Sequence, residues 1–313
     1  MLNQLISLYE NKSVYGSWLF CGKKGVGKFK TAYDFACHVI SCEYENHSKS
    51  FIENHPAITV LTRDLHKDEK KALDKKFNKG DTITKDDLKD LKKENSITIE
   101  QVRNLIENFN ISPVKQGGSR IVIIDSIDDM NNNSANCLLK FLEEPPENTV
   151  IILICHSLFK ILPTIKSRCR KIQFKVLSDE EISSIILKNY PYISKEDLKV
   201  VLNYCDGSVG LGLEFLQNNG LDVYASIRHV IENFPNIDYD IANKVVNNIV
   251  KDEIKSDIFK NFILLTLNNR AKMNYDENIT IYYEKALKMF EETKIPFNMD
   301  LRQTFISILT GNI

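Results

Sequence analysis

The chain has 313 residues, and its 41 Lys and Arg nearly balance its 42 Asp and Glu, which leaves a formal net charge of −1. Hydrophobic residues make up 43% and charged residues 27%, a composition typical of folded globular protein that excludes a wholly disordered or collagen-like chain. Because proteins that bind nucleic acid on their own usually carry a basic excess, any DNA contact is expected to be local or delegated to a partner.

The number of cysteines and the lengths of the apolar segments indicate the cellular compartment of the protein. Seven cysteines, an odd number spread over a long chain, do not form a disulfide framework. The first residues lack the pattern of a secretory signal, and apolar runs stay well below the ~18 residues of a membrane-spanning helix. We therefore expect a cytoplasmic protein without membrane contact.

The first half of the chain alternates between predicted helices and predicted strands. Thr98, with Gln101 three residues later, has the pattern of a capping box that opens a helix. Alternation of this kind predicts an α/β domain built on a mostly parallel sheet. Hydrophobic periodicity places helices at about 1–12, 31–40, from 98 onward and at 134–144, and strands at 18–21, 57–61, 121–125 and 150–155.

Two further regions set the domain boundaries. Residues 63–94 hold 11 Lys and Arg against 9 Asp and Glu, which is typical of a solvated insertion. After about residue 174 the sequence has almost only helical periodicity, beginning with 179–188, 195–205 and 210–217. We predict a sheet domain over 1–174, a small helical domain over 175–220 and an all-α domain over 221–313.

A phosphate-binding loop follows the first predicted strand. Gly22, Gly25, Gly27 and Lys28 fit the pattern G-x-x-x-x-G-K between a strand and a helix. In such a loop the backbone N–H groups surround a phosphate, and the lysine reaches the β- and γ-phosphates. Asp125, at the end of a hydrophobic strand, is the expected acid of the same site.

Two positions of this site lack the groups that ATP hydrolysis requires. Phe29 follows the loop lysine where the motif has a Ser or Thr, and a phenyl ring cannot ligate Mg²⁺. Ser126 follows Asp125 where an ATPase has a Glu that activates water, and a serine hydroxyl is too weak a base for that role. ATP or ADP binding is therefore expected to be weak, and hydrolysis absent.

Two later segments resemble a known family. Residues 135–146 are similar to the helix after the second nucleotide-binding motif of clamp-loader subunits, and Ser167-Arg168-Cys169, after residues 162–166, is similar to the SRC motif of the same family. Together with the loop, this ordered set resembles the bacterial DNA polymerase III clamp loader, and within it the delta-prime subunits. The resemblance covers roughly the first two thirds of the chain; the last third matches only in being helical.

The resemblance implies an AAA+ domain, a helical lid and a helical collar that assembles with delta and tau/gamma subunits to load a sliding clamp on primed DNA. Arg168 matches the family's arginine finger, which acts in trans on the ATP of a neighbouring subunit. The sensor positions match Cys155 and, approximately, Gly210, neither of which has the family's usual side chain. Such a subunit would be a component of the polymerase without activity of its own, a profile that fits bacterial cytoplasm.

Other interpretations stay open from sequence. The chain could be an active clamp-loader-type ATPase, or a nucleotide-gated binding module outside replication. Many clamp-loader subunits bind zinc through four cysteines after the first helix of the loop motif, but Cys37 and Cys42 form no C-x-x-C pair, so we expect no zinc.

Overall fold

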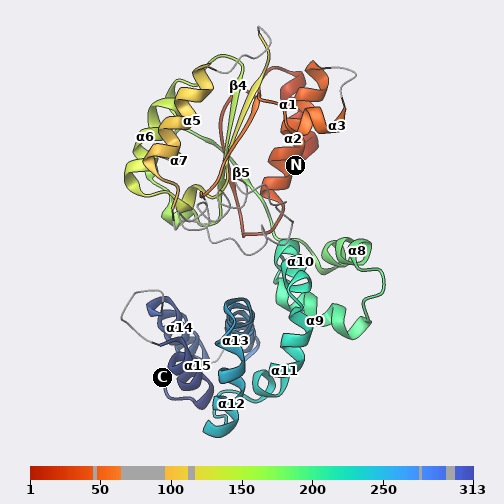
Figure 1. The fold of residues 1–313 in the computed structure, drawn as a ribbon, viewed down its shortest axis with the longest axis vertical. Coiled ribbons are helices and arrows are strands. Elements are labelled where there is room, and N and C mark those ends of the chain that lie inside the picture. Colours follow the sequence, from red (N-terminus) through yellow and green to blue (C-terminus); the bar gives the residue numbers. More distant parts are fainter. Residues whose placement is uncertain (45–47, 65–95, 112–116, 275–276, 294–299) are drawn as a thin grey trace, which may run out of the picture. The chain divides into compact units, whose positions relative to one another are not determined.

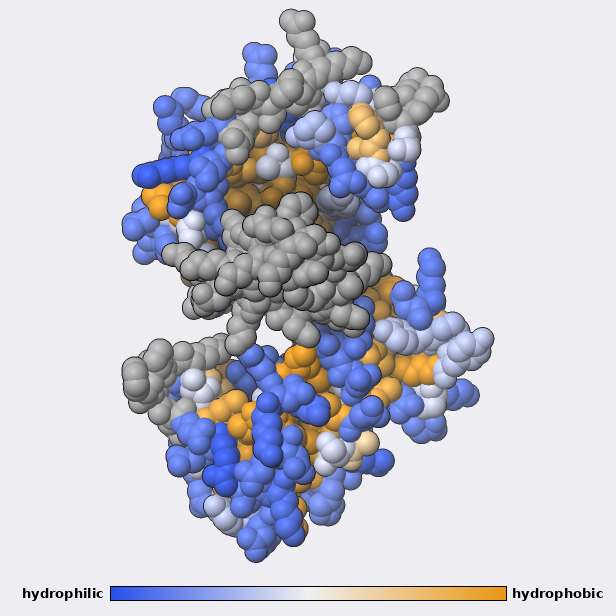
Figure 2. Space-filling view, viewed as in Figure 1, coloured by the Kyte–Doolittle hydropathy of each residue, from blue (hydrophilic) through white to orange (hydrophobic). Residues whose placement is uncertain are grey.

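The computed structural model describes residues 1–44, 48–64, 96–111, 117–274, 277–293 and 300–313. It divides the chain into two compact units, Met1–Lys175 and Val176–Ile313. Within the described ranges, no helix is long and apolar enough to cross a membrane. Hydrophilic side chains predominate on the visible face of the described residues (Figure 2).

A five-stranded sheet forms the centre of the first unit (Figure 1). All four strand pairings are parallel, in the order β2-β3-β4-β1-β5. All seven residues of β4 are buried, as expected for a central strand covered on both faces, whereas three of the four residues of the edge strand β5 are exposed. The strands are β1 (Gly16–Cys21), β2 (Ile58–Leu61), β3 (Arg120–Ile124), β4 (Thr149–Cys155) and β5 (Arg170–Gln173).

Helices cover both faces of this sheet (Figure 1). Alternate residues along β1 point to opposite faces, so that Phe20 packs with α1 and α2 while Cys21 packs with α5 and α6. On one side lie α1 (Leu2–Glu10), α2 (Lys28–Glu43) and α3 (Lys49–Glu53); on the other lie α5 (Ile99–Ile111), α6 (Asn132–Glu143) and α7 (Pro163–Lys166). Two short 3-10 helices, η2 (Ile127–Asp129) and η3 (Leu158–Lys160), follow β3 and β4.

The second unit is helical in its described residues. One hydrophobic cluster runs from Ile182 to Leu309, through both the predicted lid and the predicted collar. The division of this unit at about residue 220 stays a prediction. Its helices are α8 (Asp179–Asn189), α9 (Lys195–Cys205), α10 (Val209–Gln217), α11 (Gly220–Asn233), α12 (Tyr239–Ile249), α13 (Glu253–Asn274), α14 (Glu277–Glu292) and α15 (Leu301–Thr310).

The predicted parallel α/β domain followed by a helical region is confirmed, with local differences that include the short helices α3 and α7, which were not predicted. The helix after the phosphate loop begins at Lys28 rather than at residue 31, because Gly27 already forms its N-cap. Strand β5 was not predicted, since its sequence Arg-Lys-Ile-Gln lacks the apolar alternation of a half-buried strand. Nearly all of the charged insertion at 63–94 lies outside the described residues.

Candidate functional site

The predicted phosphate loop connects β1 to α2. Gly22, Gly25 and Gly27 have φ of 151°, 80° and 93°, a region that residues with a side chain rarely adopt. A Cβ on Gly22 would lie 2.6 Å from the carbonyl oxygen of Phe174, so the loop closes against the end of β5. The N–H of Gly22 also donates to the carbonyl of Cys155 (3.3 Å), which places the loop at the carboxyl edge of the sheet.

Lys28 lies inside this loop. Only 3% of the residue is exposed, and its ammonium group donates to the carbonyls of Gly22 (2.6 Å) and Lys23 (2.7 Å). Burial lowers the pKa of Lys28, and the nearby carboxylates of Asp128 and Asp125 oppose that shift. To bind a phosphate, the ammonium would exchange these carbonyls for phosphate oxygens.

Polar side chains gather where β3 and β4 end. Asp125 follows β3, and its N–H donates to the carbonyl of Leu61 (2.9 Å). The carboxylate of Asp128 accepts the backbone N–H of His156, with both oxygens at 2.9 Å. Because Asp125 and Asp128 act on the charge of Lys28, the structure brings the predicted loop lysine and the predicted strand-end acid to the same edge of the sheet.

His156 belongs to this edge although its sequence position gave no motif. Its Nε2 lies 2.9 Å from the hydroxyl oxygen of Ser126. Its Nδ1 is buried and has no hydrogen-bond partner within the described residues. Burial is the main cause that lowers the pKa of His156, followed by the positive charge of Lys28, so the neutral ring is favoured. Its place just beyond the carboxyl end of a parallel strand was the available signal, because ligands bind there in α/β sheets.

Position 29 has no metal-binding group. The Phe29 ring is 38% exposed and stacks on Tyr33, with centroids 5.9 Å apart and 15° between the planes. The next hydroxyl along α2, that of Thr31, donates to the carbonyl of Gly27 (3.0 Å), so it is bonded to the backbone of its own helix. The hydroxyl that ligates Mg²⁺ in the loop motif is therefore missing at this position.

No group of three or more His, Cys, Asp or Glu side chains that could hold a metal occurs within the described ranges. On α2, the Cys42 sulfur lies 3.6 Å from Nε2 of His38, one helical turn apart. Burial raises the pKa of the Cys37 thiol, which favours the protonated form over the thiolate that binds metals. The absence of zinc stays a prediction.

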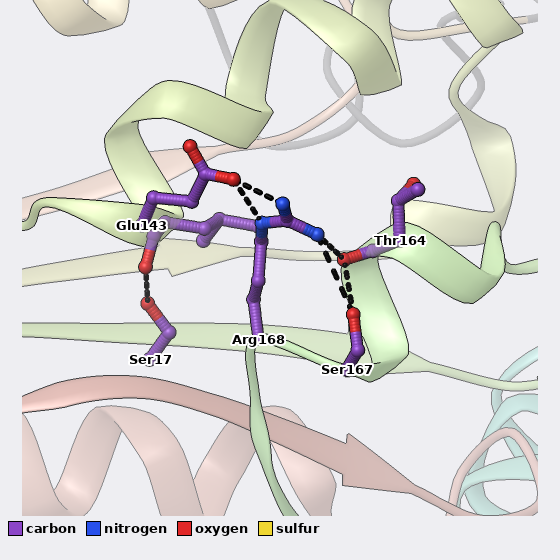
Figure 3. A network of polar contacts seen from close by, with 6 residues as sticks. Ser17, Glu143, Thr164, Ser167 and Arg168 are labelled. Atoms are coloured by element: carbon purple, nitrogen blue, oxygen red, sulfur yellow. Dashed lines mark hydrogen bonds and ion pairs between the residues drawn. The ribbon is translucent and has the colours of Figure 1, made fainter.

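Arg168 lies apart from the loop, between α7 and β5 (Figure 3). Its Nε donates to Oε1 of Glu143 (2.6 Å), to which NH2 also donates, and its NH1 donates to the carbonyl of Thr164 (2.9 Å). The structure therefore brings Gly22, Lys28 and Asp125 together but bonds Arg168 to α6 and α7. Glu143 was not singled out in the sequence, since a single acid at the end of a helix carries no pairing signal.

Comparisons with known proteins agree with this architecture. The family described as "DNA polymerase III, delta subunit" matches residues 1–178, more than half of the chain. DNA polymerase III subunit gamma of Buchnera aphidicola subsp. Schizaphis graminum is 28% identical over 209 residues, 66% of this chain and 52% of that protein. DNA polymerase III subunit delta' of Pseudomonas aeruginosa is 46% identical over 76 residues, 24% of this chain and 23% of that protein.

The matched regions thus cover about half and about a quarter of those two relatives. Among solved structures, a DNA polymerase III gamma subunit-related protein from Thermotoga maritima is similar over 99% of this chain and 98% of its own, with a TM-score of 0.55 and 15% identity. At that identity the similarity shows the fold alone, which is a parallel α/β domain with a helical C-terminal region.

Proposed function

Because the chain belongs to the DNA polymerase III delta subunit family, whose members are clamp-loader proteins, we propose that it is a non-hydrolysing, delta-prime-type subunit of a bacterial clamp loader. It assembles with delta and tau/gamma subunits, and through them acts on the sliding clamp and primed DNA. The near-neutral charge of the chain suits a subunit whose main contacts are other proteins.

The observation that carries this proposal is Phe29. Hydrolysis of ATP in a P-loop requires a metal ion bridging the β- and γ-phosphates, held in part by the hydroxyl after the loop lysine. Here that residue is an aromatic ring stacked on Tyr33, and the hydroxyl of Thr31, two residues further along α2, is bonded to the backbone. Ser126 stands at the position where an ATPase has the carboxylate that activates water. Its hydroxyl lies within hydrogen-bonding distance of His156.

The contribution of this subunit to catalysis is Arg168, which acts in trans. A guanidinium neutralises charge that builds up on the γ-phosphate in the transition state, an effect worth roughly 10³–10⁵ in rate in arginine-finger systems. Arg168 is 31% exposed and follows a short helix at the surface, where a neighbouring subunit can be reached.

The ATPase activity of the isolated chain tests the proposal. We expect no hydrolysis above background, with or without primed DNA, and the same result for Lys28→Ala. Robust hydrolysis that disappears in Lys28→Ala would overturn it in favour of an active motor. Lys30→Ala is the matched control, because Lys30 lies two residues further on α2 and forms an exposed ion pair with Asp34 (2.9 Å).

A further inference from the structure

The guanidinium of Arg168 is fixed by Glu143, the last residue of α6 (Figure 3). One carboxylate oxygen, Oε1, accepts hydrogen bonds from both Nε (2.6 Å) and NH2. The carbonyl of Thr164 accepts from NH1 (2.9 Å), and the Ser167 hydroxyl lies 3.4 Å from the same nitrogen. All three nitrogens are therefore engaged, which fixes both the position and the plane of the group.

The backbone at Glu143 is held in place by the packing of the end of α6. Phe141 and Leu142, the two residues before it, are buried in the core between α5, α6 and the sheet. The hydroxyl of Ser17, on β1, donates to the carbonyl of Leu142 (3.3 Å), which ties the end of α6 to the sheet. The carboxylate thus projects from a fixed backbone, as side chains that orient a functional group must.

The ion pair between Glu143 and Arg168 adds little to the stability of the fold. The two side chains are 31% and 45% exposed, and exposed pairs of this kind contribute little to folding. A carboxylate at the C-terminal end of a helix also faces the negative end of the helix dipole, which disfavours it there. The clearest effect of Glu143 is on the conformational freedom of Arg168. Without this partner the long side chain of Arg168 would sample many rotamers, and it would lose that entropy when it binds a phosphate.

We propose that Glu143 is the positioning residue of Arg168 and holds its guanidinium ready for an anion of the neighbouring subunit. The inference rests on the trans role of Arg168 proposed above. Glu143 occupies the Nε–NH2 edge with a single oxygen, so these bonds leave NH2 a second N–H for a phosphate oxygen. The guanidinium can then keep its orientation while it meets the nucleotide.

The test uses the clamp loader reconstituted from this chain with its delta and tau/gamma partners, ATP and primed DNA. Glu143→Gln should lower the maximal rate of ATP hydrolysis about two- to fivefold, since an exposed orienting pair is of that strength, and leave KM for ATP unchanged. Glu143→Ala should lower it at least as far. Glu144→Gln is the matched control: this neighbouring glutamate is exposed, and its replacement removes the same charge without touching Arg168.

Combining the variants separates positioning from a general structural effect. On an Arg168→Ala background, Glu143→Gln should have no further effect on the rate. An equal loss on both backgrounds, or a rate unchanged by Glu143→Gln while Arg168→Ala lowers it, would overturn the positioning role and leave the trans role intact. A rate unaffected by Arg168→Ala would overturn both. Melting temperature and size-exclusion profile, expected to match those of the parent, show that folding and assembly are preserved.

Discussion

The hydroxyl oxygen of Ser126 lies 2.9 Å from Nε2 of His156, and this contact joins the ends of β3 and β4. Ser126 has φ of 67°, in the left-handed region, so the turn after β3 directs its side chain toward the neighbouring strand end. Where an active site of this type would carry a water-activating carboxylate, the chain has a hydroxyl beside an imidazole whose pKa is lowered by burial. Because His156 can take up a proton, this pair is expected to depend on pH.

Protonation of His156 is expected to destabilise the first unit. Burial, assisted by Lys28, lowers the pKa of His156 below its ordinary value of 6.5 in the folded state. Between the folded and unfolded pKa values the unfolded chain binds more protons, so stability should fall as pH drops through 6.5.

Denaturant unfolding at about pH 7.5 and about pH 5.5 measures this effect, and His156→Gln should reduce the difference in unfolding free energy between the two conditions. His229→Gln, at an exposed position on α11, serves as the control and should leave the difference unchanged. A difference as large in His156→Gln as in the parent chain would contradict the assignment.

Two glycines of the phosphate loop should differ in their tolerance of alanine. Gly27→Ala places a Cβ in open space and costs only the strain of a left-handed residue, about 1–2 kcal/mol. Gly22→Ala adds a contact of 2.6 Å to the backbone oxygen of Phe174 and should cost clearly more, about 3 kcal/mol or above. Chemical denaturation of the two variants gives the comparison; an equal cost, or the reverse order, would count against the packing of the loop on β5.

The capping box at the start of α5 should be worth about 1 kcal/mol. The Thr98 hydroxyl accepts the N–H of Gln101 (3.3 Å), and the Gln101 side chain accepts the N–H of Thr98 (2.9 Å). Thr98→Ala removes the first of these bonds and should lower the free energy of unfolding by that amount in urea titrations. Thr98→Asp keeps a capping acceptor and should be close to neutral; a similar loss in both variants would show that the cap is not the cause.

The sequence predicted those parts of the fold and site that depend on local patterns. Strands β3 and β4 are buried apolar runs, α9 matches its predicted bounds, and the glycine loop has the φ angles that its motif requires. Strand β5 could not be predicted from the sequence, because it forms by pairing with β1 and has no apolar pattern of its own. Tertiary contact of this kind overrides propensity.

The contacts of the functional residues could not be predicted either. His156 meets Ser126 across 30 residues of sequence, and Glu143 meets Arg168 across 25, and both pairs form only because the topology places the ends of their elements together. Lys28 was predicted as a phosphate ligand, but its bonds to the carbonyls of its own loop follow from backbone geometry that a motif does not specify.

Hydrolysis by the assembled clamp loader tests the trans role most directly. Single-turnover ATP hydrolysis would be measured in complexes that differ only in this subunit, with the parent chain, Arg168→Ala or Arg168→Lys, which keeps the charge but loses the planar fork. We predict that both variants assemble normally and slow DNA-stimulated hydrolysis, although every residue of the hydrolysing subunits is unchanged. A rate equal to that of the parent complex for Arg168→Ala would contradict the account.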